Sequence, residues 1–309
     1  TGIRLRSRLP DRESIGNAYQ SARKHAGRIL LTGAIYVLLT EFVFVFVFPY
    51  LFLFINSLKY DFDLRNINTQ WIITRLNTFN YAEAFARMNY LEGLRNNLVV
   101  ALGSMAGHVL SCSLIAYGLA RFRFPGRNLM FMAILLTIII PPQVLLIPLY
   151  IQYARINWVG TFLPILVPTF VGFGLKGGLF IFIFRQFLKG LPHSYEEAAK
   201  IEGAGYFSIF FRIIIPMART SILVVAILST IWHWNDYFEP TIFLNRSTTL
   251  LFQRLGTISY WQGVMTPTGA YINPIMLAAI VMVTIPLLLI YFIFQRHFIR
   301  GIEFSGLAN

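Results

Sequence analysis

The chain has 309 residues, of which 56% are hydrophobic and 13% are charged, with a formal net charge of +13. A soluble domain usually carries about 25% charged residues. The apolar residues form long runs, such as 42–48, without the polar face of a soluble amphipathic helix. The composition therefore excludes an ordinary soluble domain and indicates a membrane protein.

Six apolar segments are long enough to cross a hydrocarbon core of ~30 Å as helices. They lie at about residues 32–57, 96–119, 129–152, 162–187, 220–244 and 272–294. A basic segment, 1–31, precedes them without a signal-peptide cleavage site, and a tail, 302–309, follows the membrane domain 32–301. We therefore expect an all-α membrane protein with six transmembrane helices.

The basic residues predict the orientation of these helices, because cytoplasmic loops are enriched in lysine and arginine. With a cytoplasmic N-terminus, the inside segments carry 17 basic residues and the outside segments carry 8. The inside segments are 1–31, 120–128, 185–219 and 295–309, and the outside segments are 58–95, 153–161 and 245–271. We expect both termini in the cytoplasm, and the positive charge to reflect topology and lipid contact rather than nucleic-acid binding.

Two predicted spans contain helix-breaking residues. The third span carries Pro141, Pro142 and Pro148, and the fourth carries Gly172, Gly174, Gly177 and Gly178. Broken helices often line transport pathways, although ordinary packing kinks explain such residues equally well.

Lys176 is an ionisable residue inside the fourth predicted span. Charged groups at membrane depth usually face a cavity or a partner. On a continuous helix its face would also carry Thr169, Gly172, Phe173 and Phe180. We expect Lys176 and Phe173 to line a solute pathway that favours carboxylates, such as uronate oligosaccharides. The alternative for Lys176 is a structural pair with Glu41 or a backbone carbonyl.

Aromatic and amide side chains gather at the outer end of the fifth predicted span. Trp232, Trp234, Asn235 and Asp236 suit the apolar faces and hydroxyl edges of sugar rings, so we expect them along a pathway or gate. The alternative is an interfacial aromatic belt.

The cytoplasmic loop 185–219 is long and patterned. Pro192 and Ser194 favour the start of a helix, and acidic residues follow in its first turn. Gly203 and Gly205 then favour its end. A second apolar segment runs from Phe207 to Pro216, so the loop predicts an exposed helix–turn–helix element.

This loop resembles the signature of permease subunits from binding-protein-dependent ABC importers. Three residues separate Glu197-Ala198-Ala199 from Gly203, and nine more separate Gly203 from a second group, Ile213, Ile215 and Pro216. Ile215 stands where the signature prefers leucine. Other stretches (116–128, 140–150, 185–192, 234–240 and 295–301) are similar to the smaller maltose-type permease of the carbohydrate branch, and the resemblance covers about 90–301.

The resemblance implies a type I importer permease with an ATPase-coupling loop at 191–216. Its first four signature residues contact the ATPase, and the last three shape the second half of the loop. It also implies that Tyr260, Trp261 and Gln262, in the outer loop 245–271, contact a solute-binding protein. Expected partners are a second, homologous permease, a homodimeric ABC ATPase that binds ATP and magnesium, a periplasmic or lipid-anchored binding protein, and the lipid of a bacterial cytoplasmic membrane.

No catalytic, cofactor or metal site is expected in this chain. Its single cysteine, Cys112, predicts a small buried residue, and its five histidines are far apart in the sequence. A phosphate-binding loop is missing, so ATP chemistry is expected of the partner ATPase rather than this chain. The expected solute is a sugar or oligosaccharide, and the alternative solutes are glycerol phosphate and a polyamine. The alternative mechanism is that of a secondary transporter.

Overall fold

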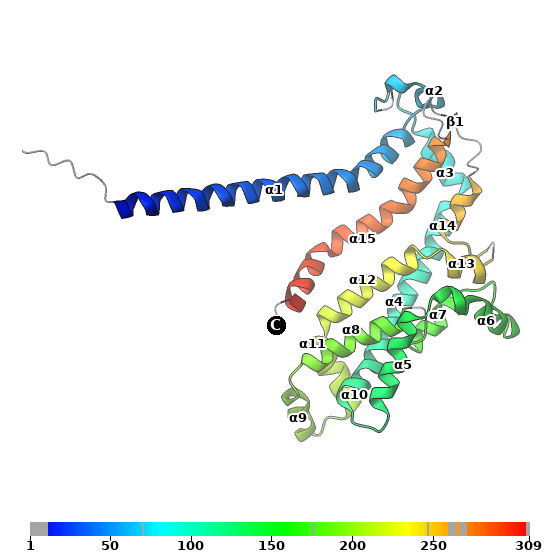
Figure 1. The fold of residues 1–309 in the computed structure, drawn as a ribbon. Helices are drawn as coiled ribbons and strands as arrows, with labels where there is room; N and C mark the ends of the chain where they lie inside the picture. Colours follow the sequence, from blue (N-terminus) through cyan, green and yellow to red (C-terminus); the bar gives the residue numbers. More distant parts are fainter. Residues whose placement is uncertain are drawn as a thin grey trace, which may run out of the picture. The chain divides into compact units, whose positions relative to one another are not determined.

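The helix α4 (Tyr90–Arg121) forms the centre of the packed part of the molecule (Figure 1). In the computed structural model, which describes residues 12–69, 71–174, 176–245, 247–258, 264–265 and 271–306, this helix packs against α12 (Arg219–Trp234), α8 (Gly177–Gly190) and α7 (Leu163–Phe170). Small residues on α4 allow these close contacts: a side chain at Gly107 would collide with Thr169 of α7. One hydrophobic core includes Cys112, which is fully buried as predicted.

The third predicted span is two helices, α5 (Arg127–Ile139) and α6 (Pro142–Arg155), which meet at an angle of 100°. The break falls at Ile140 and Pro141, as the prolines predict, because proline cannot donate the backbone hydrogen bond that would continue the helix. The fourth predicted span is also two helices, α7 and α8. Gly172 and Gly174, at φ +70° and +136°, lie in the connection between them.

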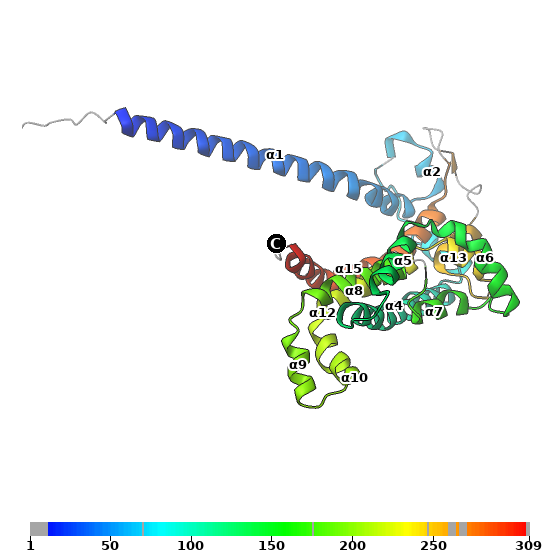
Figure 2. The same cartoon turned by 60° about the horizontal axis from the view of Figure 1, so that its bottom comes forward.

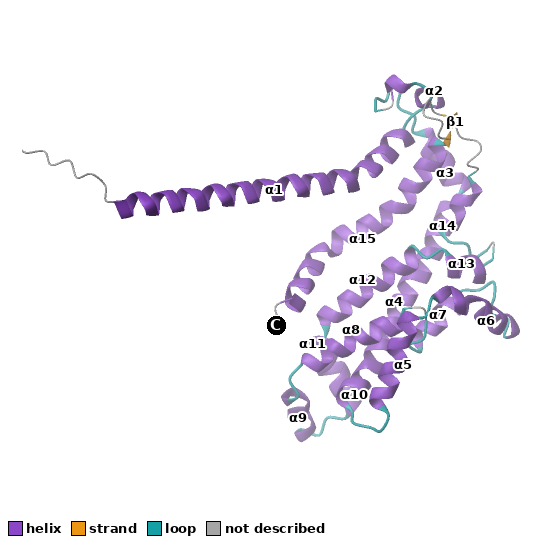
Figure 3. Cartoon of the chain, viewed as in Figure 1, coloured by secondary structure: helices purple, strands orange, loops and turns teal. Residues whose placement is uncertain are grey.

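The fifth predicted span is shorter than expected, since α12 ends at Trp234 and a separate helix, α13 (Phe238–Phe243), follows. Beyond it come α14 (Leu251–Arg254), the 3₁₀ turn η3 (Leu255–Thr257), and strands β1 (Val264–Met265) and β2 (Tyr271–Ile272), which pair antiparallel. The last helix, α15 (Pro274–Gly306), packs against α3 (Phe79–Arg87) and α12 around a second core. The described chain is thus almost entirely helical (Figure 3).

The chain divides into two units after Ile55. The first unit holds nearly all of α1 (Arg12–Ser57), whose side chains from Ile29 to Phe54 are mostly exposed apolar groups, as lipid contact requires. The second begins at the last two residues of α1 and continues with α2 (Asp61–Leu64), the 3₁₀ turn η1 (Ile67–Thr69) and α3.

Within the described residues, three helices are long and apolar enough to cross a membrane: Gly27–Ser57, Tyr90–Arg121 and Pro274–Gln295. The number rises to five if two bent pairs each count as one span, namely α5 with α6 and the helical stretch Tyr206–Met217 with α12. These helices confirm a multi-pass helical membrane protein. The count of six spans stays a prediction, because α7 and α8 are short and separated.

Candidate functional site

The predicted helix–turn–helix lies beyond the ends of α8 and α12 (Figure 2). Its first helix is α9 (Ser194–Ile201), and Gly203 follows in the left-handed conformation, at φ +83°. The chain then runs through α10 (Tyr206–Ile209), a π-helical turn, η2 (Phe210–Ile214), and α11 (Ile215–Met217) before it bends by 79° into α12. The helix start at Ser194 and the glycine-ended turn therefore follow the sequence prediction.

The signature residues divide between the surface and the interior of this element. Glu197, Ala198, Gly203 and Pro216 are exposed, Ile213 and Ile215 are half-buried, and Ala199 is buried. Apolar side chains beside them are also exposed, including Ile201 at 88% and Phe207 at 70%. Exposed apolar groups of this size are typical of a surface that binds another protein.

A buried ion pair holds α9 against α4. Arg121, the last residue of α4, approaches Glu196 with 2.7 Å between Nε and Oε1, and the two side chains are only 2% and 4% exposed. The guanidinium also donates hydrogen bonds to the carbonyl of Leu191 and to Nε2 of His193, each at 2.9 Å. The signature loop is therefore attached to the central helix by a charged, buried contact.

The second predicted site forms around Lys176. The Nζ of Lys176 lies 5.0 Å from the ring centroid of Trp232, and Trp232 stacks on Phe180 at 5.5 Å. Lys176 is also in electrostatic range of two carboxyl groups, Asp236 and Glu239. The structure thus brings together two separately predicted pathway residues, Lys176 and Trp232.

The helical face proposed for Lys176 is wrong, because the described residues 171–174 are not helical and Lys176 precedes α8. Phe173, in the same connection, is 53% exposed. Trp234 points away from this group: it is 2% exposed, and its indole donates to the carbonyl of Val283 on α15 at 3.4 Å. Its position is that of a packing residue.

Asn235 is exposed and donates to the carbonyl of Ile231 at 3.0 Å. Asp236 is half-buried and accepts a hydrogen bond from the backbone of Phe238 at 3.1 Å. Both therefore help to form the turn between α12 and α13, whether or not they also contact solute.

Two histidines that are 125 positions apart meet beside Lys176. The rings of His108 and His233 lie 5.3 Å apart, and Ser229 bonds to Nδ1 of His108 at 3.1 Å. Within the described residues, no group of three metal-binding side chains forms. Sequence spacing gives no signal for this meeting, which depends on the packing of α4 on α12.

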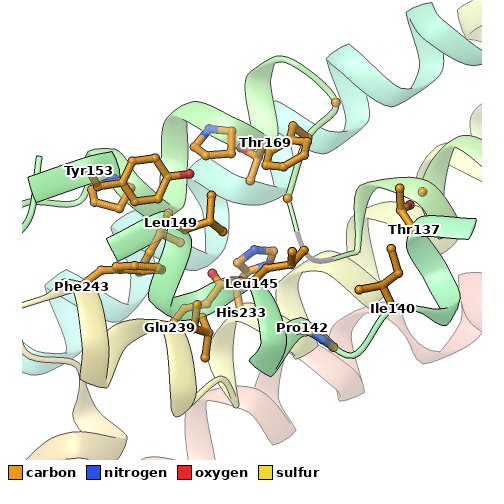
Figure 4. A pocket seen from close by; sticks show the side chains of 18 of the residues that line it. Thr137, Ile140, Pro142, Leu145, Leu149, Tyr153, Thr169, His233, Glu239 and Phe243 are labelled. Atoms are coloured by element: carbon orange, nitrogen blue, oxygen red, sulfur yellow. The ribbon is translucent and has the colours of Figure 1, made fainter. Parts of the chain in front are cut away.

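A cavity of about 190 Å³ lies in the elbow between α5 and α6 (Figure 4). Helices α7, α8, α12 and α13 complete its wall, and Phe173 lies on it. The lining is mainly apolar, but it includes Tyr153, His233 and Glu239. The sequence predictions did not include Tyr153 or Glu239.

The predicted binding-protein contacts, Tyr260, Trp261 and Gln262, lie outside the described residues. The start of the same outer loop is fixed to α4. The side chain of Asn97 accepts a hydrogen bond from the backbone of Leu251 at 3.1 Å, and Arg254 pairs with Glu92 at 3.1 Å. One helix therefore contacts both the signature loop, through Arg121, and the predicted outer loop, through Glu92 and Asn97, and these contacts are about 36–44 Å apart along the helix.

This fold and its exposed signature loop define a membrane-embedded transport subunit. The chain belongs to the family of binding-protein-dependent transport system inner membrane components, whose profile matches residues 100–304. This range agrees with the region of resemblance expected from the sequence.

Two relatives illustrate the match. A probable ABC transporter permease of Pyrococcus horikoshii is 35% identical over 215 residues, which cover 68% of this chain and 73% of the relative. An arabinooligosaccharide transport permease of Halalkalibacterium halodurans is 29% identical over 220 residues, which cover 71% of this chain and 75% of the relative.

A solved structure has the same fold. It belongs to a bacterial ABC transporter involved in the import of the acidic polysaccharide alginate, and it superposes with a TM-score of 0.70 at 18% identity. The superposition covers 94% of this chain and all of the other.

Proposed function

We propose that this chain is one of two permeases in an ATP-driven importer of sugars or oligosaccharides. It lies in a bacterial cytoplasmic membrane with both termini inside and six spans. Its partners are a homologous permease, a homodimeric ABC ATPase and a periplasmic or lipid-anchored binding protein. ATP and magnesium bind to the ATPase. The main support is the exposed signature loop of a family member, anchored to the central helix.

In this mechanism, the ATPase closes on ATP and displaces α9 through Glu197, Ala198 and the turn at Gly203. The Arg121–Glu196 pair makes α9 move together with α4, since breaking a buried ion pair is costly. Helix α4 carries the displacement to the helices packed on it. The pathway then opens alternately to each side by rigid-body motion.

The variant Gly203→Asp tests the coupling role. A Cβ at Gly203 meets no atom within 4 Å, and aspartate tolerates its left-handed backbone better than most residues. The loop should therefore fold, while an added side chain and charge disturb the ATPase contact. We expect ATP hydrolysis without solute uptake in proteoliposomes of the complete transporter.

Two control variants distinguish a specific effect at Gly203 from the effects of the added negative charge and of the left-handed backbone. Gly203→Asn keeps the backbone preference without the charge, and Gly205→Asp places the same charge two residues away, at an ordinary φ of −74°. Normal coupled uptake by Gly203→Asp would reject the role of this turn.

The proposed solute class rests on the relatives, one of which is named for arabinooligosaccharides. Glycerol phosphate and polyamines are the alternative solutes, and a secondary transporter is the alternative mechanism. Purification of the complex with its binding protein, followed by mass spectrometry of the bound solute, distinguishes the solutes. Uptake that persists without an ATPase subunit would reject the proposed mechanism.

An acidic sugar is the second candidate solute. The positive charge of Lys176, beside the predicted pathway residue Trp232, favours it. The two carboxyl groups near Lys176 weaken it, because they offset the single positive charge. If Lys176 binds a solute carboxylate, Lys176→Met should reduce uptake of acidic sugars far more than uptake of neutral ones. Equal effects on both would remove charge recognition.

A further inference from the structure

The cavity in the elbow of α5 and α6 combines an apolar wall with polar groups from α6, α12 and α13. Leu149, Ile165 and Phe243 supply part of the apolar wall. Glu239 enters from α13 and His233 from α12, while the hydroxyl of Tyr153 points toward the interior (Figure 4). At about 30 Å³ per water, the volume of 190 Å³ holds roughly six water molecules. This space suits a single small ring.

The polar groups of this cavity have unused hydrogen-bonding capacity. Glu239 is 9% exposed, and its carboxyl group forms no hydrogen bond or ion pair with any residue that the structure describes. The Tyr153 side chain is 7% exposed, and within the same described residues its hydroxyl has no partner either. Neither group is among the fully enclosed unpaired atoms of the described residues, so both stay open to the cavity, where a water molecule or a ligand can bond to them.

The hydrogen bonds of His233 determine what its free nitrogen can do. Nδ1 lies 2.8 Å from the carbonyl oxygen of Ser229 and must donate to it, because a carbonyl only accepts. The neutral ring therefore has an acceptor at Nε2. Together, Nε2 and the Glu239 carboxyl group offer acceptors, and the Tyr153 hydroxyl can donate or accept.

This set of groups selects among the classes of solute. Several acceptors around a small space require a ligand with several donors, and sugar hydroxyls meet this need. The apolar wall suits the C–H face of a sugar ring. An added carboxylate gains no net attraction, because the single nearby cation, Lys176, already faces two carboxyl groups, Glu239 and Asp236. We propose that the cavity is a subsite for one uncharged sugar ring, bound through Glu239, His233 and Tyr153.

This subsite rests on the proposed transport function, and it names the part of the solute that this permease binds. It also assigns recognition of neutral hydroxyls to the elbow cavity rather than to the cation of Lys176, which lies in electrostatic range of Glu239. An acidic oligosaccharide would then have to present an uncharged unit to the elbow.

Protection of Glu239 from chemical modification tests the subsite directly. The assembled transporter in lipid nanodiscs is treated with an apolar carbodiimide, which adds covalently to membrane-buried carboxyl groups, and the adduct on Glu239 is measured by mass spectrometry. D-glucose and L-arabinose are the neutral probes, D-glucuronate is the acidic probe, and putrescine is the cationic probe. The Glu239→Gln variant identifies the mass-spectrometric signal of the Glu239 adduct, because that signal must be missing when the carboxyl group is replaced.

We expect glucose or arabinose to slow the modification and glucuronate to slow it much less. Tyr153→Phe should raise the half-protecting sugar concentration about fivefold, as expected for the loss of one hydrogen bond. Tyr150→Phe is the matched control, because Tyr150 lies on the same helix, is 41% exposed and is not part of the lining. Its half-protecting concentration should match the native value.

Four results would overturn the subsite: a native Glu239 that never reacts, no protection by either sugar, equal protection by glucose and glucuronate, or protection by putrescine alone. The assay needs neither ATP nor transport, so the two proposals fail separately. ATP-dependent sugar uptake without protection rejects only the subsite, whereas protection without ATP-dependent uptake rejects only the importer.

Discussion

The side chain of Arg121 joins two segments that are about 70 residues apart in the sequence. It pairs with Glu196, and it satisfies the carbonyl of Leu191 in the connection that precedes α9. Arg121 and Glu196 were not among the sequence-predicted sites. Glu196 precedes the signature, and Arg121 was counted only as a basic loop residue. Their role depends on a contact that only the folded chain brings about.

Breaking this pair should release α9 from the central helix. Arg121→Met leaves Glu196 as an uncompensated buried charge, which costs about 3–5 kcal/mol. We expect faster amide hydrogen exchange in 194–201, with little change in the middle of α4. The double variant Arg121→Met/Glu196→Leu should recover part of the protection, because an apolar pair replaces the ion pair without a buried charge.

The exposed pair Arg87–Glu83 provides the control for this experiment. Its side chains are 35% and 30% exposed, so its loss should cost no more than about 1 kcal/mol. If Arg121→Met speeds exchange in 194–201 no more than Arg87→Met speeds exchange in α3, the Arg121–Glu196 pair does not anchor the coupling loop.

At the scale of helices, the sequence predicted where helices are interrupted better than which residues share a helical face. Pro141 and Gly172 mark real interruptions, because backbone restrictions are local and can be read from single residues. The face of Lys176 was wrong for the same reason: the glycines that mark the break also end the helical spacing on which that face relied. The meeting of His108 with His233, and the placing of Glu239 on a cavity, depend on packing between distant helices.

The contact of α4 with α7 gives a sharp test of this packing. A Cβ at Gly107 would collide with Thr169, whose carbonyl also accepts a hydrogen bond from Ser111 at 2.6 Å. Thr169 is 2% exposed and cannot move aside freely. Gly107→Ala should therefore destabilise the protein by about 1–3 kcal/mol through overpacking, seen as a lower Tm in detergent.

Gly118→Ala is the matched substitution on the same helix. Its Cβ would meet no atom within 4 Å, and alanine is favoured over glycine in a helix by about 0.5–1 kcal/mol. We expect a Tm equal to or above the native value. A Tm that is lowered equally by both substitutions would show that the α4–α7 contact is not the cause.

At the scale of the whole molecule, composition and charge predicted a helical membrane protein, and the fold and family confirm it. The orientation rests on 17 basic residues inside against 8 outside. It decides which face meets an ATPase and which meets a binding protein. An experiment that distinguishes the two sides of the membrane tests this prediction.

Labelling of introduced cysteines with a membrane-impermeant maleimide provides that experiment. The native Cys112 is fully buried and should stay unlabelled, so it adds no signal to that of the introduced cysteine. Asp61 and Glu202 are exposed, the first in the predicted outer segment and the second in the coupling loop. In spheroplasts, Asp61→Cys should react at once, whereas Glu202→Cys should react only after the membrane is opened. Labelling of Glu202→Cys from outside would place the signature loop on the wrong face for an ATPase and would reject both the orientation and the coupling mechanism.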